Sequence, residues 1–114
     1  MVDGIYSITF RGAVDWGLGL LILQKGTITG ADAGGISYDG NYTIENSSIN
    51  FNAMLTVPPG ASLVQGTPVK SISYEIPINA LFSEDVLKNG ELVTLEMPQG
   101  PVNVIFRLLR GFDD

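Results

Sequence analysis

The chain has 114 residues, of which 45% are hydrophobic and 16% charged, and its formal net charge is −6. This length is typical of one domain, so we expect residues 1–114 to form a single domain that buries its own core. Cysteine and histidine are both absent, which excludes disulfides, thiolate zinc sites, cysteine nucleophiles and the usual general base at neutral pH. The six basic residues are scattered, so direct nucleic-acid binding is not expected.

Two stretches bear on where the protein resides. The segment Met1–Gly4 carries an acid where a secretory signal would carry basic residues. The longest apolar run, Leu18–Leu23, is far shorter than the roughly 20 residues that span a bilayer. We therefore expect a cytoplasmic protein without a membrane segment.

The first two predicted strands are patterned differently. Tyr6, Ile8 and Phe10 form the single apolar face of the first. Val14–Leu23 is apolar on both faces, so it either lies in the middle of a sheet or is covered by a second subunit. The candidate dimer residues on this strand are Leu18, Leu20 and Ile22.

Three further strands are expected before the middle of the chain. Thr27–Gly30 and Ile36–Tyr42 are short and are joined through the turn residues Asp32–Gly35. Ile49–Val57 has apolar side chains at every second position, alternating with Asn50, Asn52 and Thr56, which is the pattern of a strand buried on one face.

A turn-rich stretch, Val57–Pro68, follows and is expected to be a mobile loop. Lys70–Ile78 again alternates, and Pro77 predicts an edge position or a bulge near the end of this strand. Ser83–Leu87 is the one helical candidate, a single turn that Ser83 would cap.

Leu92–Met97 and Val102–Leu109 form a last predicted hairpin across Pro98–Pro101. The total is about eight strands at short spacing, which predicts an all-β fold, either a small closed barrel or a two-sheet sandwich.

No side-chain pattern predicts a catalytic site, a metal site or a cofactor. The acids Asp32 and Asp39 are explained as turn residues that bond their own backbone. The candidates for lining a ligand cavity are Trp16, Tyr38 and Tyr74. A small barrel is either packed solid or holds one small ligand, and we expect the filled interior because it is the usual case.

Three segments, met in order along the chain, carry a family resemblance. Asp3–Phe10, Gly26–Asp32 and Tyr38–Gly40 resemble GrlR, the negative regulator of a bacterial type III secretion locus. The resemblance covers roughly the first third of the chain, and beyond it only the spacing of the strands is shared.

This resemblance implies a lipocalin-like, eight-stranded antiparallel barrel that forms homodimers, and it favours the barrel over the sandwich. It also implies sequestration of a transcriptional activator through an exposed acidic loop, Glu-Asp-Glu-Asp in that family. Here the corresponding segment is Tyr42–Ser47, in which only Glu45 is acidic. The candidate residues for contact with a partner are Tyr42, Glu45 and Asn46.

The expected function is therefore that of a non-enzymatic binding protein, GrlR-like and homodimeric, that sequesters a protein partner such as a transcriptional activator. The alternative is a lipocalin-like carrier that holds a small apolar ligand inside the barrel.

Overall fold

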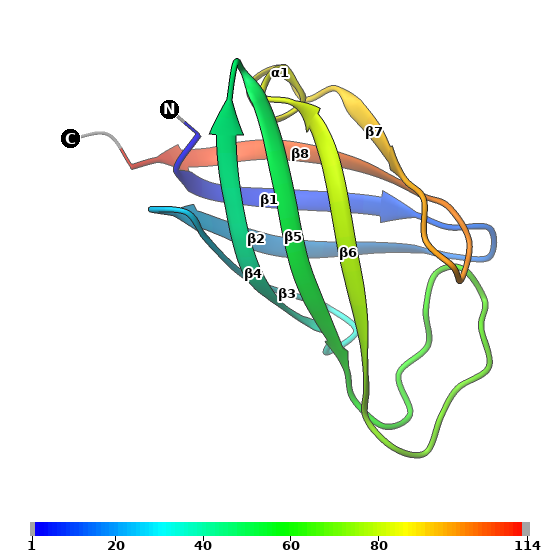
Figure 1. The fold of residues 1–114 in the computed structure, drawn as a ribbon. Helices are drawn as coiled ribbons and strands as arrows, with labels where there is room; N and C mark the ends of the chain where they lie inside the picture. Colours follow the sequence, from blue (N-terminus) through cyan, green and yellow to red (C-terminus); the bar gives the residue numbers. More distant parts are fainter. Residues whose placement is uncertain (1, 113–114) are drawn as a thin grey trace.

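The computed structural model describes residues 2–112, which form one eight-stranded antiparallel sheet curled into a nearly closed barrel (Figure 1). This confirms the all-β barrel predicted from the sequence and excludes the two-sheet sandwich. The elements in chain order are β1 (Gly4–Arg11), β2 (Trp16–Gln24), β3 (Thr27–Asp32), β4 (Ser37–Glu45), β5 (Ser48–Val57), β6 (Tyr74–Ser83), α1 (Asp85–Asn89), β7 (Leu92–Leu95) and β8 (Val102–Gly111).

The strands follow the order β6-β5-β4-β3-β2-β1-β8-β7 across the sheet. Every neighbouring pair is antiparallel, and β6 and β7 are the two edges. Pro77, which has no N–H to give to a neighbouring strand, lies in the edge strand β6, as its presence predicts. The strand β2 pairs with β1 and β3 and is therefore central in the sheet.

One predicted strand begins in the wrong place. The alternation over Lys70–Ile78 suggested a strand from Lys70, but β6 begins at Tyr74, the partner of Val57. Pro58 ends β5, so no strand is left beside the residues before Tyr74. The Lys70 carbonyl instead accepts a 2.9 Å hydrogen bond from the N–H of Gly60 inside the loop.

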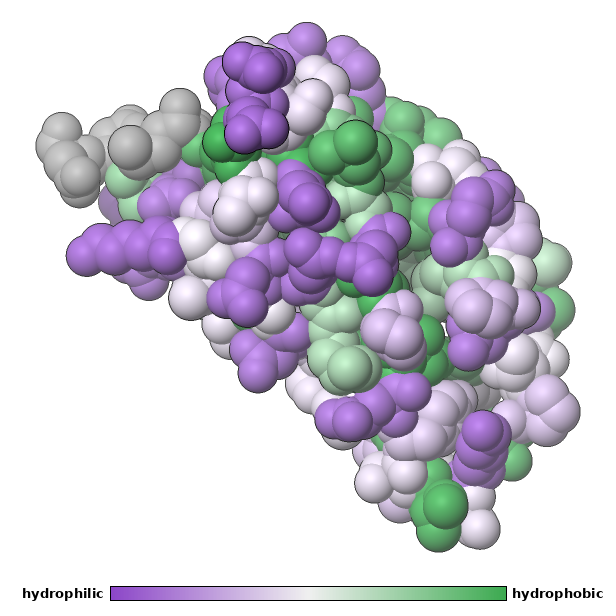
Figure 2. All heavy atoms as spheres, viewed as in Figure 1, coloured by the Kyte–Doolittle hydropathy of each residue, from purple (hydrophilic) through white to green (hydrophobic). Residues whose placement is uncertain are grey.

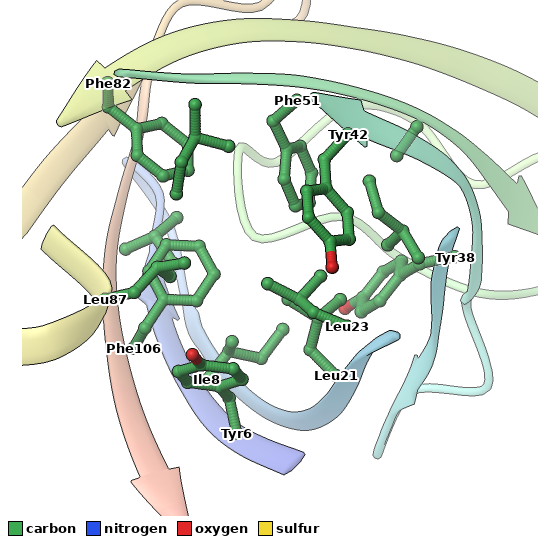
Figure 3. Close-up of a cluster of buried hydrophobic side chains, with 14 of the residues drawn as sticks. Tyr6, Ile8, Leu21, Leu23, Tyr38, Tyr42, Phe51, Phe82, Leu87 and Phe106 are labelled. Atoms are coloured by element: carbon green, nitrogen blue, oxygen red, sulfur yellow. The ribbon is translucent and has the colours of Figure 1, made fainter. Parts of the chain in front are cut away.

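The single helical turn follows β6 directly. Its N-cap is Glu84, without a side-chain cap, and not Ser83 as the sequence predicted; the side-chain oxygen of Ser83, one residue earlier, accepts a hydrogen bond of 3.1 Å from the Asp85 N–H. The turn ends at Gly90, whose φ of 66° is left-handed. Its residue Leu87 is 1% exposed and packs into the end of the barrel between β6 and β8 (Figure 3).

One half of the barrel interior is filled. The inward side chains near the chain termini close on one another (Figure 3). The Phe82 ring lies 5.9 Å from each of the rings of Phe51 and Phe106. Other buried residues of this half are Val2, Tyr6, Leu23, Ile28, Tyr42, Ile49 and Leu87. This half conforms to the filled interior that the sequence predicts.

Candidate functional site

The other half of the barrel is hollow. It encloses a cavity of about 360 Å³, within the size range of small-ligand sites. Most wall residues are apolar or aromatic, and they come from all eight strands and the loops at this end. Among them are Ile8, Phe10, Leu21, Tyr38, Phe51, Ala53, Leu55, Ile78, Leu95, Val104 and Phe106. We call this part of the barrel the hollow end; its presence corrects the expectation of a fully packed interior.

Two aromatic rings line the hollow end because each lies over a glycine of the next strand. Phe10 is paired with Gly17, and a Cβ at Gly17 would lie 2.3 Å from the Phe10 ring. Tyr38 is paired with Gly30, where a Cβ would lie 3.0 Å from the Tyr38 ring. With no side chain beneath them, both rings lie against the wall. The centre of the barrel is left open as a result.

The loop between β5 and β6, residues 58–73, covers the mouth of the hollow end, and we call it the mouth loop. It was expected to be mobile, and in the structure its middle is anchored. The carbonyl of Val64 accepts hydrogen bonds of 3.0 Å from the N–H groups of both Val14 and Asp15. Leu63 is buried at 7% exposure and lines the cavity. A ligand would therefore enter past the mouth loop.

A carboxylate is fixed at the rim of the cavity. Asp32 Oδ1 accepts hydrogen bonds from the N–H groups of Gly34, at 2.9 Å, and Ile36, at 3.1 Å. Its Oδ2 accepts a 2.6 Å bond from the Tyr38 hydroxyl. Burial and this hydrogen bond hold the pKa of Tyr38 above its usual value. Asp32 is thus the turn residue that the sequence predicts, whereas Asp39 lies inside β4.

The outside of the barrel carries a second candidate site. Along β2 every outward side chain except Gln24 at its end is apolar, and three of them are about half exposed, Trp16 at 59%, Leu18 at 50% and Leu20 at 53%. Leu18 is paired with Thr9, Thr9 with Ile105 and Ile105 with Leu92, so the polar Thr9 of β1 lies between the apolar side chains of β2 and those of β8 and β7. We define the outer apolar face as Trp16, Leu18, Leu20, Ile22, Leu92 and Ile105.

The opposite wall of the barrel is polar. Figure 2 views the molecule from the side of β4, β5 and β6, where hydrophilic and intermediate residues cover most of the surface. Met54 and Leu81 are exposed apolar exceptions. The outward polar residues of these strands include Asp39, Asn41, Thr43, Asn50, Asn52, Glu75 and Asn79. Apolar exposure is therefore concentrated on one side of the barrel, and such patches commonly mark association surfaces.

Two of the three residues predicted to line a cavity do so in the structure. Trp16 and Tyr38 line the hollow end, whereas Tyr74 is outside its wall. Tyr74 begins β6, where the Lys70 ammonium lies 4.3 Å from the centre of its ring. The predicted dimer residues Leu18, Leu20 and Ile22 share the outward face of β2.

The predicted partner-binding residues do not share one surface. Glu45 and Asn46 are exposed at the tip of the β4–β5 hairpin. Tyr42 is 7% exposed and points into the barrel (Figure 3), where its hydroxyl donates a hydrogen bond to Asp3. A partner at this tip would meet Glu45 and Asn46 but not Tyr42.

The residues that carry the family resemblance have structural roles here. Asp3 accepts the hydrogen bond from Tyr42 and one of 3.0 Å from the N–H of Lys25, joining β1 to two other parts of the barrel. Tyr6 donates to the carbonyl of Val2. A Cβ at Gly40 would lie 2.0 Å from the carbonyl oxygen of Asn52. With the Asp32–Tyr38 pair, these contacts give residues of all three segments a structural role in this barrel.

Sequence reasoning missed the aromatic–glycine pairs and the mouth loop's contribution to the cavity. The spacing Phe10…Gly17 across a short turn could have indicated the first pair, because strands joined by a tight hairpin align such positions. No comparable sequence pattern predicts the buried position of Leu63 in the cavity wall, because that position depends on how a long loop folds back.

Neither a scan against protein-family models nor a search of curated proteins finds a match to this chain. Across residues 2–112, helices long and apolar enough to cross a membrane are absent.

Proposed function

We propose that this protein is a non-enzymatic binding protein that forms a homodimer through its outer apolar face and, as a homodimer, sequesters a protein partner. The observation that carries the proposal is the half-exposed row Trp16, Leu18 and Leu20 on a central strand. Large apolar side chains placed together on one wall gain free energy when a protein surface removes them from water.

The geometry of the outer apolar face suits a two-fold dimer. Its residues follow β2 at every second position, so they form a straight column about 20 Å long at roughly 6.7 Å per pair of residues. A two-fold axis through such a column brings each residue onto its counterpart in the other copy, and one surface patch then serves both subunits.

The resemblance to GrlR supports a regulatory role for the dimer in a bacterial cytoplasm, with a transcriptional activator as the sequestered partner. In this chain the hairpin tip that holds Glu45 and Asn46 provides little negative charge. Shape and apolar contact would therefore contribute more to partner binding than charge complementarity.

The test for a protein partner uses two variants that each introduce a glutamate on the outer surface, on opposite walls of the barrel. Leu20→Glu places a charge on the outer apolar face, and Asn52→Glu places the same charge on the polar wall, where Asn52 is exposed. Immobilised wild-type protein and Asn52→Glu should retain the same protein from extracts of the native cell, and Leu20→Glu should not. Equal retention by all three would contradict the proposed surface.

A second candidate function is carriage of a small apolar ligand, and the hollow end is the specific observation that favours it. A phenylalanine in place of Ala53, which lines the cavity, would fill part of the open volume. The neutral probe 1-octanol should bind wild-type protein and fail to bind Ala53→Phe, with folding of the variant checked by circular dichroism. Absence of octanol binding to wild-type protein would remove this second function.

A further inference from the structure

The charged side chains in the cavity wall are all acidic. Its residues include two carboxylates, Asp15 and Asp32, and neither a lysine nor an arginine. We propose that the hollow end binds an apolar molecule bearing an ammonium group, with its apolar part inside the barrel and the cation held at the rim by Asp15, Asp32 and the aromatic rings. This inference rests on the proposed ligand-carrying function and adds the chemical class of the ligand.

The carboxylate of Asp32 is held in place and can accept one more hydrogen bond. Its three hydrogen bonds, from Gly34, Ile36 and Tyr38, hold both oxygens in place. An ionised carboxylate has about four acceptor positions, so one remains for a donor on the ligand. An ammonium donor would form a charge-assisted hydrogen bond there, which is stronger than a bond between neutral groups.

Asp15 stands at the opposite end of β2 from the filled half, in the loop before Trp16. Its Oδ1 accepts a 2.8 Å hydrogen bond from the Trp16 N–H, and its own N–H is bonded to Val64 of the mouth loop. The backbone of Asp15 is therefore bonded to the mouth loop, and its carboxylate is held by the N–H of the next residue. Because it is exposed, its contribution is reduced by solvent and salt.

Aromatic rings provide an independent attraction for a cation. The rings of Phe10 and Tyr38 belong to the wall of the hollow end, and Trp16, which is 59% exposed, borders it from the outward face of β2. The faces of such rings carry partial negative charge, and together with carboxylates they are the usual partners of alkylammonium groups in proteins. The wall offers an anion no basic side chain. The Tyr38 hydroxyl is also not free to donate to an anion, because it already donates its hydrogen bond to Asp32.

The nearest basic residues do not cancel this charge inside the cavity. Arg11 follows Phe10 along β1, so its side chain lies on the outer surface. Lys70 lies over the ring of Tyr74. Neither belongs to the cavity wall. With a net charge of −6, the whole protein also favours the approach of cations over that of anions.

The experiment compares three probes with the same eight-carbon chain, namely octylammonium, 1-octanol and octanoate, by calorimetry at low salt. The fluorescence of Trp16, the single tryptophan, is a second readout. We expect octylammonium to bind roughly tenfold more tightly than octanoate, with octanol between them. Asp15→Asn and Asp32→Asn should each weaken the binding of octylammonium several-fold more than that of octanol. Asp39→Asn, on the outer surface of β4, is the matched control and should change nothing.

The outcomes separate the two proposals. If octanol binds wild-type protein but not Ala53→Phe, and octylammonium binds no more tightly than octanoate, the cavity is a ligand site and the inferred preference for a cation is wrong. If none of the three probes binds, ligand carriage fails and the preference fails with it. A preference for octylammonium that persists unchanged in both aspartate variants would also contradict the inference.

Discussion

The hydroxyl of Tyr38 donates a 2.6 Å hydrogen bond to Oδ2 of Asp32, joining the start of β4 to the end of β3. The Tyr38 ring covers Gly30 while its hydroxyl holds the rim carboxylate. One side chain therefore shapes the cavity and fixes the charge at its edge.

Replacing Tyr38 by phenylalanine keeps the ring over Gly30 and removes the hydrogen bond. Asp32 retains its two backbone donors, so the loss is confined to one bond with a charged acceptor, and we expect the free energy of unfolding to fall by about 1–3 kcal/mol. Urea denaturation measures this value. Tyr74→Phe is the matched control, because Tyr74 is outside the cavity wall. A loss of equal size in both variants would contradict the role given to Tyr38.

Alkaline pH should destabilise the fold more steeply than in a protein with exposed tyrosines. Burial is the main reason that the pKa of Tyr6 and that of Tyr42 are each raised to about 12, and the pKa of Tyr38 is also raised. Above about pH 10 the unfolded chain releases these protons while the folded chain keeps them. The unfolded state then binds fewer protons, so the stability present below pH 10 is lost as pH rises toward 12.

Urea midpoints measured from about pH 8 to pH 11 test this dependence. The decline should begin near pH 10 and should be shallower in Tyr38→Phe, which has one fewer buried phenol. A midpoint that stays constant to pH 11 in the wild-type protein would show that these tyrosines ionise normally.

Adding one methyl group at Gly17 should close part of the cavity. The new Cβ would lie 2.3 Å from the Phe10 ring, so the ring must leave the wall and move toward the open centre. We expect Gly17→Ala to lose octanol binding and about 1–3 kcal/mol of stability. The double variant Phe10→Leu with Gly17→Ala should recover binding, because leucine lacks the ring atoms that clash. Unchanged binding in Gly17→Ala alone would contradict the proposed cause of the hollow.

The sequence is sufficient to predict the eight strands and the barrel, because alternation along segments such as Ile49–Val57 reports directly on which face is buried. It also indicates the double-sided apolar character of β2. The start of β6 was misplaced because alternation continues to Ile72, which is 69% exposed, where no strand remains for pairing. Local patterning does not contain that long-range information.

The site was less predictable than the fold for the same reason. Tyr42 and Tyr38 follow one pattern in β4, yet one ring fills the barrel and the other lines a cavity. Their partners on β5 differ, Phe51 for Tyr42 and Leu55 for Tyr38, and the Tyr38 ring also lies over Gly30 of β3. Such pairings follow from register, which a single sequence does not determine.

A glycine in the turn between β4 and β5 should stabilise the protein. Asn46 and Ser47 both have positive φ, 53° and 65°, as a two-residue turn of this hairpin type requires. Glycine adopts this conformation without strain, so Ser47→Gly should raise the free energy of unfolding by about 0.5–1 kcal/mol. The same change at Ser48, the first residue of β5, should lower it. Thermal unfolding of the two variants checks the sign, and a loss at both positions would contradict the assignment.

The central claim, that the outer apolar face is an association surface, is tested most directly by the molar mass in solution. Light scattering coupled to size exclusion should give twice the chain mass of 12.2 kDa for the wild-type protein and for Asn52→Glu, and a single chain mass for Leu20→Glu. A wild-type protein that is monomeric at micromolar concentration, or a Leu20→Glu variant that remains a dimer, would contradict the account.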